Sequence, residues 1–331
     1  MISLLKSLAL TILVGSNTAY WGHTYLAEGN DKVYALRSLS PHSSLCVFDA
    51  EVLKGKEGVI ELSSLQVPMI ESKTEGDESC HITLLEREAV VSDYTSGTLT
   101  LYPLDKEGNV KGKTRLLHFD GSSIHSTRQK SSHIHSSTLS PNDKELVVVD
   151  LGCDKIYRFE VEKGRVAKQL PTVSTPVGSG PRFSTYSKDG ALLYVVTELS
   201  DEVLVYRTAD FALLGRYPMG DANPSGGAHI ALSADGRYLY ASLRVSSVAK
   251  DCPISDGVAI YECLAEGRLK KLHYQPVGGH PRHFAVSADG KALVVACRDD
   301  STIEIYPLKN GVPTGKVERV SVEKPTYVGL R

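Results

Sequence analysis

Basic and acidic side chains recur at fixed distances from a serine that is repeated along the chain. The repeated serines are Ser140, Ser187, Ser233 and Ser287. Five residues before them stand His135, Arg182, Ala228 and Arg282, and four before them stand Ser136, Phe183, His229 and His283. Eleven residues after them stand Leu151, Glu198, Arg244 and Arg298. Because each set keeps one position in its repeat, we expect the polar members to occupy equivalent places in the fold.

These residue types favour the binding of a small anionic molecule. Guanidinium groups hold carboxylate and phosphate oxygens in pairs, and most of the charged members are arginines. Glu198 would lie among cations, which favours its ionised form. A histidine or a glutamate in such a place can also take a proton from water.

Each serine lies between two predicted strands. In the copy from Ser287, the stretch HFAVS runs into an Asp-Gly turn and KALVVAC returns, followed by a further alternating strand TIEIYPL. An antiparallel hairpin brings its two open ends together, so the three sets of residues should lie at the end opposite the turn.

The serines are 47, 46 and 54 residues apart, and the last interval contains a long loop around Val245 to Gly257. A degenerate copy, HITLLEREAVVSDYTSGTLTLYPL, begins at His81. A period of about 45 residues with three or four strands is typical of a propeller blade. The prediction is therefore all-β: a seven-bladed β-propeller with about four antiparallel strands per blade, as a single domain over residues 20–331. Its first strands would line a central channel, with the polar residues around one mouth. A β-sandwich is disfavoured because the period is too long and too regular.

The two ends of the chain lead to separate expectations. The stretch KPTYVGL, Lys324 to Leu330, should form a strand that pairs with one from near the N-terminus. Met1 to Ala19 resembles a short secretory signal with cleavage after Ser16 or Ala19. The alternative is an N-terminal extension, disordered or strand-like. Accordingly we predict a secreted or periplasmic protein, with a cytoplasmic location as the alternative.

Composition excludes several classes of partner. A formal net charge of −2 does not support nucleic-acid binding, and no apolar run is long enough to span a membrane. No cofactor and no metal are expected, because the polar residues predicted around the channel mouth include almost no carboxylates. We also expect a monomer. Of the six cysteines, Cys252 and Cys263 flank the long loop and are the first candidates for a disulfide, although free buried thiols explain the count equally well.

Three segments resemble the lactonase propeller family, which includes bacterial 6-phosphogluconolactonases and fungal 3-carboxy-cis,cis-muconate lactonizing enzymes. They are HIHSSTLSPNDKELVVVDLGCDKIYRF, GSGPRFSTYSKDGALLYVVTELSDEVLVY and GGHPRHFAVSADGKALVVACRDDSTIEIY. The segment GSSIHSTRQK, Gly121 to Lys130, matches the family as well. The resemblance covers about Cys80 to Leu308 and implies the seven-bladed fold.

The resemblance implies a catalytic set of one histidine, two arginines and one glutamate. These roles fall on His135, with His133 beside it, and on Arg182, Glu198 and Arg244. The other predicted substrate-binding residues come from the aligned sets described above and are His229, Arg282, His283 and Arg298, to which His133 is added. The chain departs from the family pattern at Ser132, Phe183, Leu243 and Cys297, which concerns the substrate more than the fold.

Two reactions fit these residues. In lactone hydrolysis, His135 or Glu198 would activate water while Arg182 and Arg244 stabilise the oxyanion and hold the anionic substrate. In the alternative, a cycloisomerase, the arginines would bind the carboxylates of a muconate and a proton would move to or from carbon. The third hypothesis is a non-catalytic propeller that serves as a binding platform. If Arg182 and Arg244 belong to a site, their replacement by alanine should abolish turnover and leave thermal unfolding nearly unchanged.

Overall fold

The computed structural model describes residues 11–16, 23–39, 42–54, 56–62, 68, 70–220, 226–244 and 255–331. Their contacts group into two compact units. Unit 1 comprises Met1–Thr18, Lys56–Ser64 and Phe183–Arg331, and unit 2 comprises Ala19–Gly55 and Leu65–Arg182.

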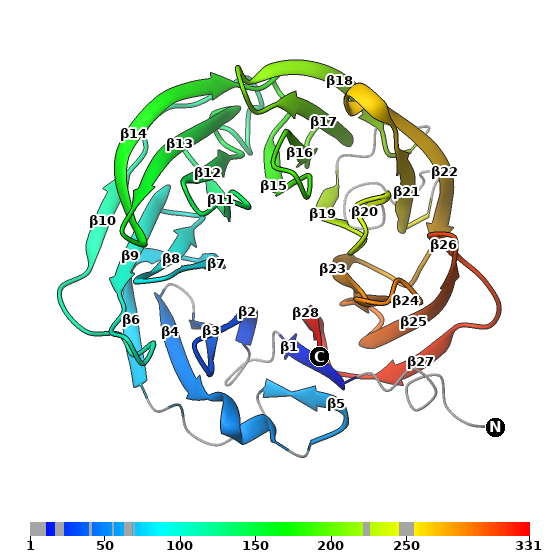
Figure 1. Ribbon diagram of the computed structural model, residues 1–331, viewed down its shortest axis with the longest axis horizontal. Helices are drawn as coiled ribbons and strands as arrows, with labels where there is room; N and C mark the ends of the chain where they lie inside the picture. The colour runs from blue at the N-terminus through cyan, green and yellow to red at the C-terminus, as the bar shows by residue number, and fades with distance from the viewer. Residues whose placement is uncertain are drawn as a thin grey trace. The chain divides into compact units, whose positions relative to one another are not determined.

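Unit 2 is built from antiparallel sheets of four strands (Figure 1). One sheet has the order β2-β3-β4-β6, from β2 (His23–Gly29), β3 (Lys32–Leu39), β4 (His42–Asp49) and β6 (Ile70–Asp77). The next contains β7 (Ser79–Leu85), β8 (Glu88–Asp93), β9 (Thr98–Pro103) and β10 (Arg115–His118). The last contains β11 (Ile134–Leu139), β12 (Glu145–Asp150), β13 (Lys155–Glu162) and β14 (Arg165–Ser174).

Unit 1 repeats the same arrangement. Its first sheet contains β15 (Pro181–Tyr186), β16 (Leu192–Thr197), β17 (Glu202–Arg207) and β18 (Ala212–Pro218), and its second contains β19 (Gly227–Leu232), β20 (Tyr238–Leu243), β21 (Gly257–Cys263) and β22 (Leu269–Pro276). The third contains β23 (Pro281–Val286), β24 (Ala292–Cys297), β25 (Thr302–Lys309), β26 (Val312–Pro313) and β27 (Glu318–Ser321). The fourth has the order β28-β1-β5, from β28 (Pro325–Leu330), β1 (Thr11–Ser16) and β5 (Gly58–Glu61).

The described residues thus form seven sheets, and their helices are short 3-10 turns such as Ala50–Leu53 and Ala265–Gly267. The predicted all-β, seven-bladed fold is confirmed, with about four antiparallel strands in most blades. That residues 20–331 are a single domain stays a prediction.

The second strand of each repeat lies deepest in its unit. All six residues of β8, β20 and β24 are buried, because their sheets are covered on both faces. This explains why β20 and β24 are nearly continuous apolar runs rather than alternating ones, whereas β8 also buries Glu88, Ser92 and Asp93. The residue that follows each of them is therefore fixed at the end of a rigid strand.

The serine that marks each repeat has a structural role in the turn. The Ser287 hydroxyl donates to Asp289 at 2.7 Å and accepts the amide of Ala292 at 2.9 Å, and Gly290 adopts a φ of +69°. The same pair of bonds forms around Ser187 and around Ser233. The S-x-D-G motif thus closes the hairpin, as the sequence predicts.

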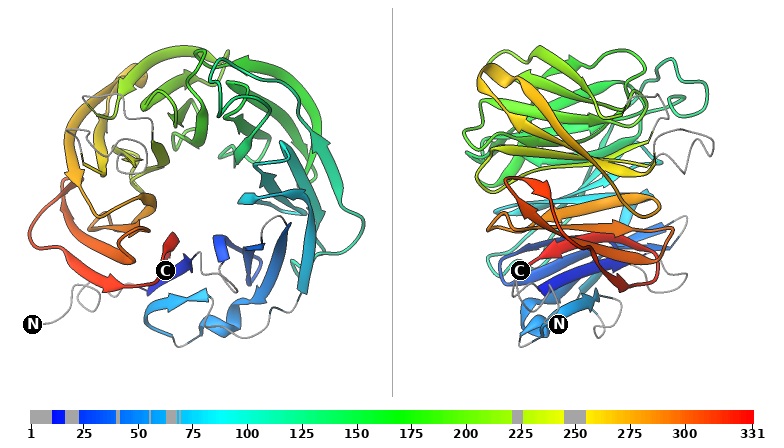
Figure 2. Two further views of the ribbon diagram at one scale, coloured as in Figure 1. Left: turned by 180° about the vertical axis from the view of Figure 1, so that it is seen from behind. Right: turned by 90° about the vertical axis from the view of Figure 1, so that its right-hand side faces the viewer.

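The predicted pairing of the chain ends is confirmed within unit 1. β28 runs antiparallel to β1, with Val14 opposite Val328, and the two strands lie side by side although they come from opposite ends of the chain (Figures 1 and 2). Ile12, Leu13 and Val14 are buried in this sheet. The predicted signal peptide is not confirmed, because residues 11–16 are a strand of the fold and the described fold begins at Thr11 rather than at residue 20. Residues 1–10 and 17–19 lie outside the described residues.

Cys46, Cys80, Cys153, Cys263 and Cys297 carry free thiols. The predicted partner of Cys263, Cys252, lies outside the described residues together with the rest of 245–254. In the part of the chain that the structure describes, no helix is long and apolar enough to cross a bilayer.

Candidate functional site

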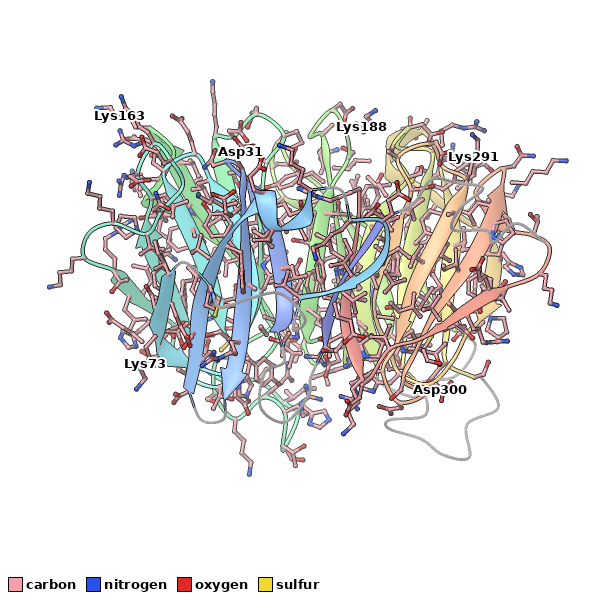
Figure 3. All side chains as sticks on the ribbon, turned by 90° about the horizontal axis from the view of Figure 1, so that it is seen from below. Asp31, Lys73, Lys163, Lys188, Lys291 and Asp300 are labelled. Carbon is pink, nitrogen blue, oxygen red and sulfur yellow. The ribbon has the colours of Figure 1, made fainter. Side chains whose placement is uncertain are left out.

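The predicted residues lie at the ends of the strands that are opposite the Asp-Gly turns. Figure 3 shows this for unit 1, where Lys188 and Lys291, which flank Asp189 and Gly290 of two turns, project from one face and Asp300 lies at the other. Asp300 follows Arg298 by two residues. The sequence-based placement of these side chains opposite the turns agrees with the structure.

The first strand of a repeat changes its pairing register close to its start. The shift leaves Cys80, His135 and Arg282 as the extra residue in β7, β11 and β23, respectively. β19 has a similar shift after Gly227. Such a bulge re-aims a side chain relative to the alternation of the strand, which explains why two successive residues of each first strand can serve one site.

In four of the sheets, the residue after the second strand is held by one recurring backbone bond. Its amide donates to a carbonyl just before the first strand of the same sheet, at 3.0–3.2 Å. This bond fixes Tyr94, Leu151, Arg244 and Arg298. Glu198 occupies the same position in its own sheet, directly after β16. Tyr94, which the sequence analysis did not select, therefore belongs to the same set as Glu198 and Arg244.

Glu198 and Arg244 form a buried ion pair in unit 1. The Arg244 Nη2 atom lies 2.9 Å from Glu198 Oε2, and each side chain is only 8% exposed. Arg244 also donates from Nε to the Gly226 carbonyl at 3.0 Å and from Nη2 to the Gly227 carbonyl at 3.1 Å. Charge and several hydrogen bonds thus fix both side chains before any ligand arrives.

The close approach of Arg244 depends on glycine. A Cβ atom on Gly227 would lie 2.0 Å from the Thr197 carbonyl oxygen, and one on Gly226 would lie 2.4 Å from the Arg244 carbonyl oxygen. Asp201 accepts both glycine amides, at 2.6 and 3.1 Å. The segment that carries the acceptors of Arg244 is therefore fixed by backbone packing and by one aspartate.

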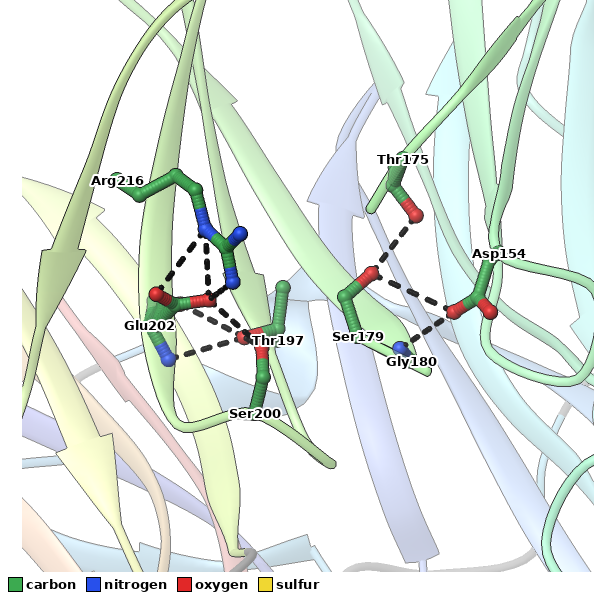
Figure 4. Close-up of polar contacts among 8 residues, drawn as sticks. All are labelled: Asp154, Thr175, Ser179, Gly180, Thr197, Ser200, Glu202 and Arg216. Carbon is green, nitrogen blue, oxygen red and sulfur yellow. Dashed lines mark hydrogen bonds and ion pairs between the residues drawn. The ribbon is translucent and has the colours of Figure 1, made fainter. Parts of the chain in front are cut away.

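An equivalent aspartate holds the corresponding segment in unit 2. Asp154 accepts the amide of Gly180 at 2.7 Å and the Ser179 hydroxyl (Figure 4). It also accepts the amide of Gly178 at 2.6 Å. Gly180 lies directly before β15, which carries Arg182. Asp154, like Asp201, fixes a strand start.

His229 and His283 belong to an aromatic stack in unit 1. Their ring centroids are 3.9 Å apart, and Phe183 meets His229 edge-on at 4.9 Å. His283 Nδ1 accepts the amide of Val328 at 3.4 Å, and its ring lies against Tyr327. His283 therefore also supports the strand that joins the chain ends.

The other two predicted cations of unit 1 differ in their surroundings. Arg298 is 31% exposed and contacts the neighbouring Asp299 at 2.8 Å, so part of its charge is compensated locally. Arg282 is half-buried at its bulge position.

In unit 2, His133 is oriented by main-chain atoms. Its Nδ1 lies 3.0 Å from the Tyr94 carbonyl oxygen, and its own amide donates to Asp150 at 2.8 Å. Because a carbonyl oxygen can only accept, Nδ1 carries the hydrogen, and neutral His133 has its lone pair on Nε2. His133 thus has the tautomer that a general base needs.

His135 lies beside it and is 5% exposed. Its carbonyl accepts from the Cys80 thiol at 3.1 Å, and its ring meets Tyr94 edge-on with centroids 5.7 Å apart.

Arg182 is buried, and the Ser136 hydroxyl donates to its carbonyl at 3.0 Å. It lies close enough to His81 to affect that ring: burial and, to a smaller extent, the charge of Arg182 lower the pKa of His81 to about 3. His81 is therefore neutral at neutral pH. Sequence reasoning missed it, although the degenerate copy that begins at His81 contained the signal.

A cavity of about 230 Å³ lies at the turn end of unit 1, between the loops that contain Asp235 and Asp289. Both carboxylates already accept a serine hydroxyl and a backbone amide, so they serve the turns. Among the described residues, no three histidine, cysteine or acidic side chains gather as metal ligands.

Known proteins resemble this chain over nearly its full length. Residues 19–330 match the family described as Lactonase, 7-bladed beta-propeller. A 6-phosphogluconolactonase of Formosa agariphila is 31% identical over 243 residues, which cover 70% of this chain and 66% of that protein. The 6-phosphogluconolactonase of Bacillus subtilis is 26% identical over 92% of this chain and 86% of its own length.

A crystal structure from Bacteroides fragilis, described as a candidate 6-phosphogluconolactonase, superposes with a TM-score of 0.84. It is 28% identical, and the match covers 97% of each chain. The repeats, the seven sheets and the match over residues 19–330 together show that this chain belongs to the Lactonase, 7-bladed beta-propeller family.

Proposed function

We propose that this protein is a lactone hydrolase that opens a sugar lactone or sugar phospholactone, and that its substrate is anionic. The buried Glu198–Arg244 pair carries the proposal, because a charged pair with 8% exposure at the end of a strand costs desolvation energy that the fold does not need. The named relatives of the family support the reaction class.

The reaction needs no covalent intermediate. Water attacks the lactone carbonyl and gives its proton to a base, for which Glu198, His135 and His133 have the required chemistry. As the new C–O bond forms, the carbonyl oxygen gains negative charge, which a guanidinium group stabilises, that of Arg244 in unit 1 or that of Arg182 in unit 2. The ring C–O bond then breaks, and the leaving alkoxide takes the proton, so the product is a hydroxy acid.

The remaining arginine and histidine side chains of unit 1 would set the substrate class. Arg282, Arg298, His229 and His283 suit a phosphate or carboxylate group on the substrate. The monomeric state and the location in the cell stay predictions.

The test is ring opening of 6-phosphoglucono-δ-lactone and glucono-δ-lactone by the full chain, with the uncatalysed rate subtracted. The informative variant is Arg244→Lys, which keeps the charge and loses the planar guanidinium. Arg216→Lys is the matched control, because Arg216 pairs with Glu202 at 2.7 Å but is half exposed (Figure 4).

Turnover that falls in Arg244→Lys and persists in Arg216→Lys supports the proposal. A preference for the phosphorylated lactone would show that the protein recognises the negative charge of the substrate. Absence of turnover with both lactones would overturn the proposal, and 3-carboxymuconate would then distinguish a cycloisomerase from a binding platform.

A further inference from the structure

Tyr94 connects the two histidines of unit 2. It follows β8 at the position that Glu198 and Arg244 occupy in their own sheets, and its amide donates to the Glu78 carbonyl at 3.2 Å. A residue held by this recurring bond is placed by the backbone, whatever its side chain. The Tyr94 side chain is therefore not needed to hold this backbone position and can serve the site.

Two groups of Tyr94 contact the histidines. Its carbonyl accepts from His133 Nδ1 at 3.0 Å. Its ring stacks on the His133 ring, with centroids 4.5 Å apart and an interplanar angle of 10°, and meets His135 edge-on. The backbone of Tyr94 thus selects the tautomer of His133, while its ring restricts the orientation of both imidazoles.

The hydroxyl of Tyr94 is held in turn by Arg128, whose Nη2 donates to it at 3.0 Å. Arg128 comes from the loop between β10 and β11. His125 Nδ1 accepts the Arg128 amide at 3.2 Å, and buried Gln129 anchors the loop to the Leu151 carbonyl and to Asp154, each at 2.9 Å. The tyrosine ring is therefore fixed at both ends, by its backbone and by a built loop.

We propose that Tyr94 is a positioning residue of the active site, which holds His133 in the tautomer that accepts a proton at Nε2, and that Arg128 acts through Tyr94. This inference rests on the proposed function for its role in turnover. The tautomer and the geometry can be measured without any substrate.

The leading test compares Tyr94→Leu with Tyr94→Phe in the full chain. Leucine occupies the equivalent position at Leu151, so the fold accepts it there, whereas phenylalanine keeps the ring. In Tyr94→Leu, kcat should fall about 10- to 100-fold with KM nearly unchanged, because the base loses its orientation rather than the substrate its contacts. Tyr94→Phe should restore most of the activity. Tyr274→Leu, which removes a ring on the outer strand β22, is the matched control and should leave kcat unchanged.

Arg128→Gln is an independent test of the role of the Tyr94 hydroxyl. Alone it should lower kcat by a smaller factor than Tyr94→Leu, and combined with Tyr94→Phe it should add nothing, because the hydroxyl through which it acts is already gone. Additive effects of these two changes would overturn the role of Arg128.

Imidazole nitrogen chemical shifts from NMR separate this inference from the lactonase proposal. Wild-type protein should show His133 with the hydrogen on Nδ1, and Tyr94→Leu should keep it there, because the carbonyl of residue 94 is retained. Relaxation of the His133 ring should instead show greater mobility in Tyr94→Leu, because the stacked ring is gone, whether or not lactones are turned over. The positioning role would be overturned by a hydrogen on Nε2 of wild-type His133, by an equally ordered His133 ring in Tyr94→Leu, or by equal losses of kcat in the leucine and phenylalanine variants.

Discussion

The two ends of the hairpins differ in what is repeated. At the turn end the side chains themselves recur: a serine hydroxyl bonds an aspartate two residues later and an amide five residues later. At the opposite end only the backbone bond recurs, and the side chains it carries are tyrosine, leucine and arginine, all different in chemistry or partners. A repeated side chain maintains the fold, whereas a repeated backbone position with varied side chains is where the protein can build a site.

The aspartates at the two ends of the hairpins also differ in the direction of their pKa shifts. Hydrogen bonds from a serine hydroxyl and from backbone amides lower the pKa of the turn aspartates Asp189 and Asp235. Burial at the other end raises the pKa of Asp93, directly before Tyr94, to about 6, although three hydroxyl groups bond it and lower the pKa in part. The turn end thus stabilises exposed aspartates in their ionised form, whereas burial at the opposite end disfavours the ionised form of Asp93.

The largest expected effect comes from breaking the buried pair at the site end. Glu198→Gln should lower kcat/KM about 100- to 1,000-fold, because Arg244 loses the charge that fixes it. Arg244→Ala should also destabilise the fold by about 3–5 kcal/mol, since it leaves a buried carboxylate without its cation. This differs from the sequence-based expectation of nearly unchanged unfolding. Kinetics and urea denaturation measure the two effects, and a fully stable, inactive Arg244→Ala would contradict the energetic part.

Asp93 gives the next largest effect, and it depends on pH. Its folded pKa of about 6 lies above the ordinary value of 3.8, so the folded state binds the proton more tightly. The stabilisation is complete below pH 3.8 and is lost as the pH rises through about 6, amounting to about 3 kcal/mol in total. Asp93→Asn should therefore gain stability relative to wild type between pH 4 and pH 7, as followed by denaturation at each pH.

Asp189→Asn at the turn end is the comparison for that experiment. The Asp189 pKa is lowered, so its contribution is present above the ordinary pKa and is lost as the pH falls. The stability difference from wild type should therefore change with pH in the opposite direction and by less, because this carboxylate is exposed. Parallel pH profiles for the two variants would remove the distinction in charge between the two ends.

A smaller effect is expected for Gly290→Ala at the turn end. A Cβ atom there meets nothing within 4 Å, so only the positive φ of +69° opposes it. The expected cost is about 1 kcal/mol of stability with activity per folded molecule unchanged. Thermal unfolding and a lactonase assay test both parts, and a large loss of kcat would show that the turn end takes part in the reaction.

The smallest effect should come from Glu202→Gln. Glu202 also pairs with an arginine, but Arg216 is half exposed and the pair lies outside the set at the strand ends. The cost should stay below about 1 kcal/mol, and turnover should be unaffected. A loss of activity comparable to that of Glu198→Gln would show that burial is not what distinguishes the two pairs.

Much of the architecture could be predicted because the sequence repeats one pattern of strands and turns. The serine spacing located Arg182, Glu198 and Arg244, and the alternation in KPTYVGL located the final strand. His81 and Tyr94 were missed because their copy lacks the S-x-D-G turn that set the alignment, although its backbone is the same.

Other features have no local pattern in the sequence. The pairing of Glu198 with Arg244, and the selection of the His133 tautomer by the carbonyl of a residue 39 positions away, depend on three-dimensional neighbours. The strand at Thr11–Ser16 was expected only as the alternative to a secretory signal, because a short apolar run after a lysine is typical of both.

The sheet β28-β1-β5 has a consequence for synthesis on the ribosome. β1 leaves the ribosomal exit tunnel long before its antiparallel partner β28, in which Val328 lies opposite Val14. Until β28 has been made, one edge of this apolar strand lacks the partner that covers it in the folded protein, which exposes it to chaperones and to other chains. Emergence of β28, rather than emergence of any earlier blade, is therefore the event that covers this edge.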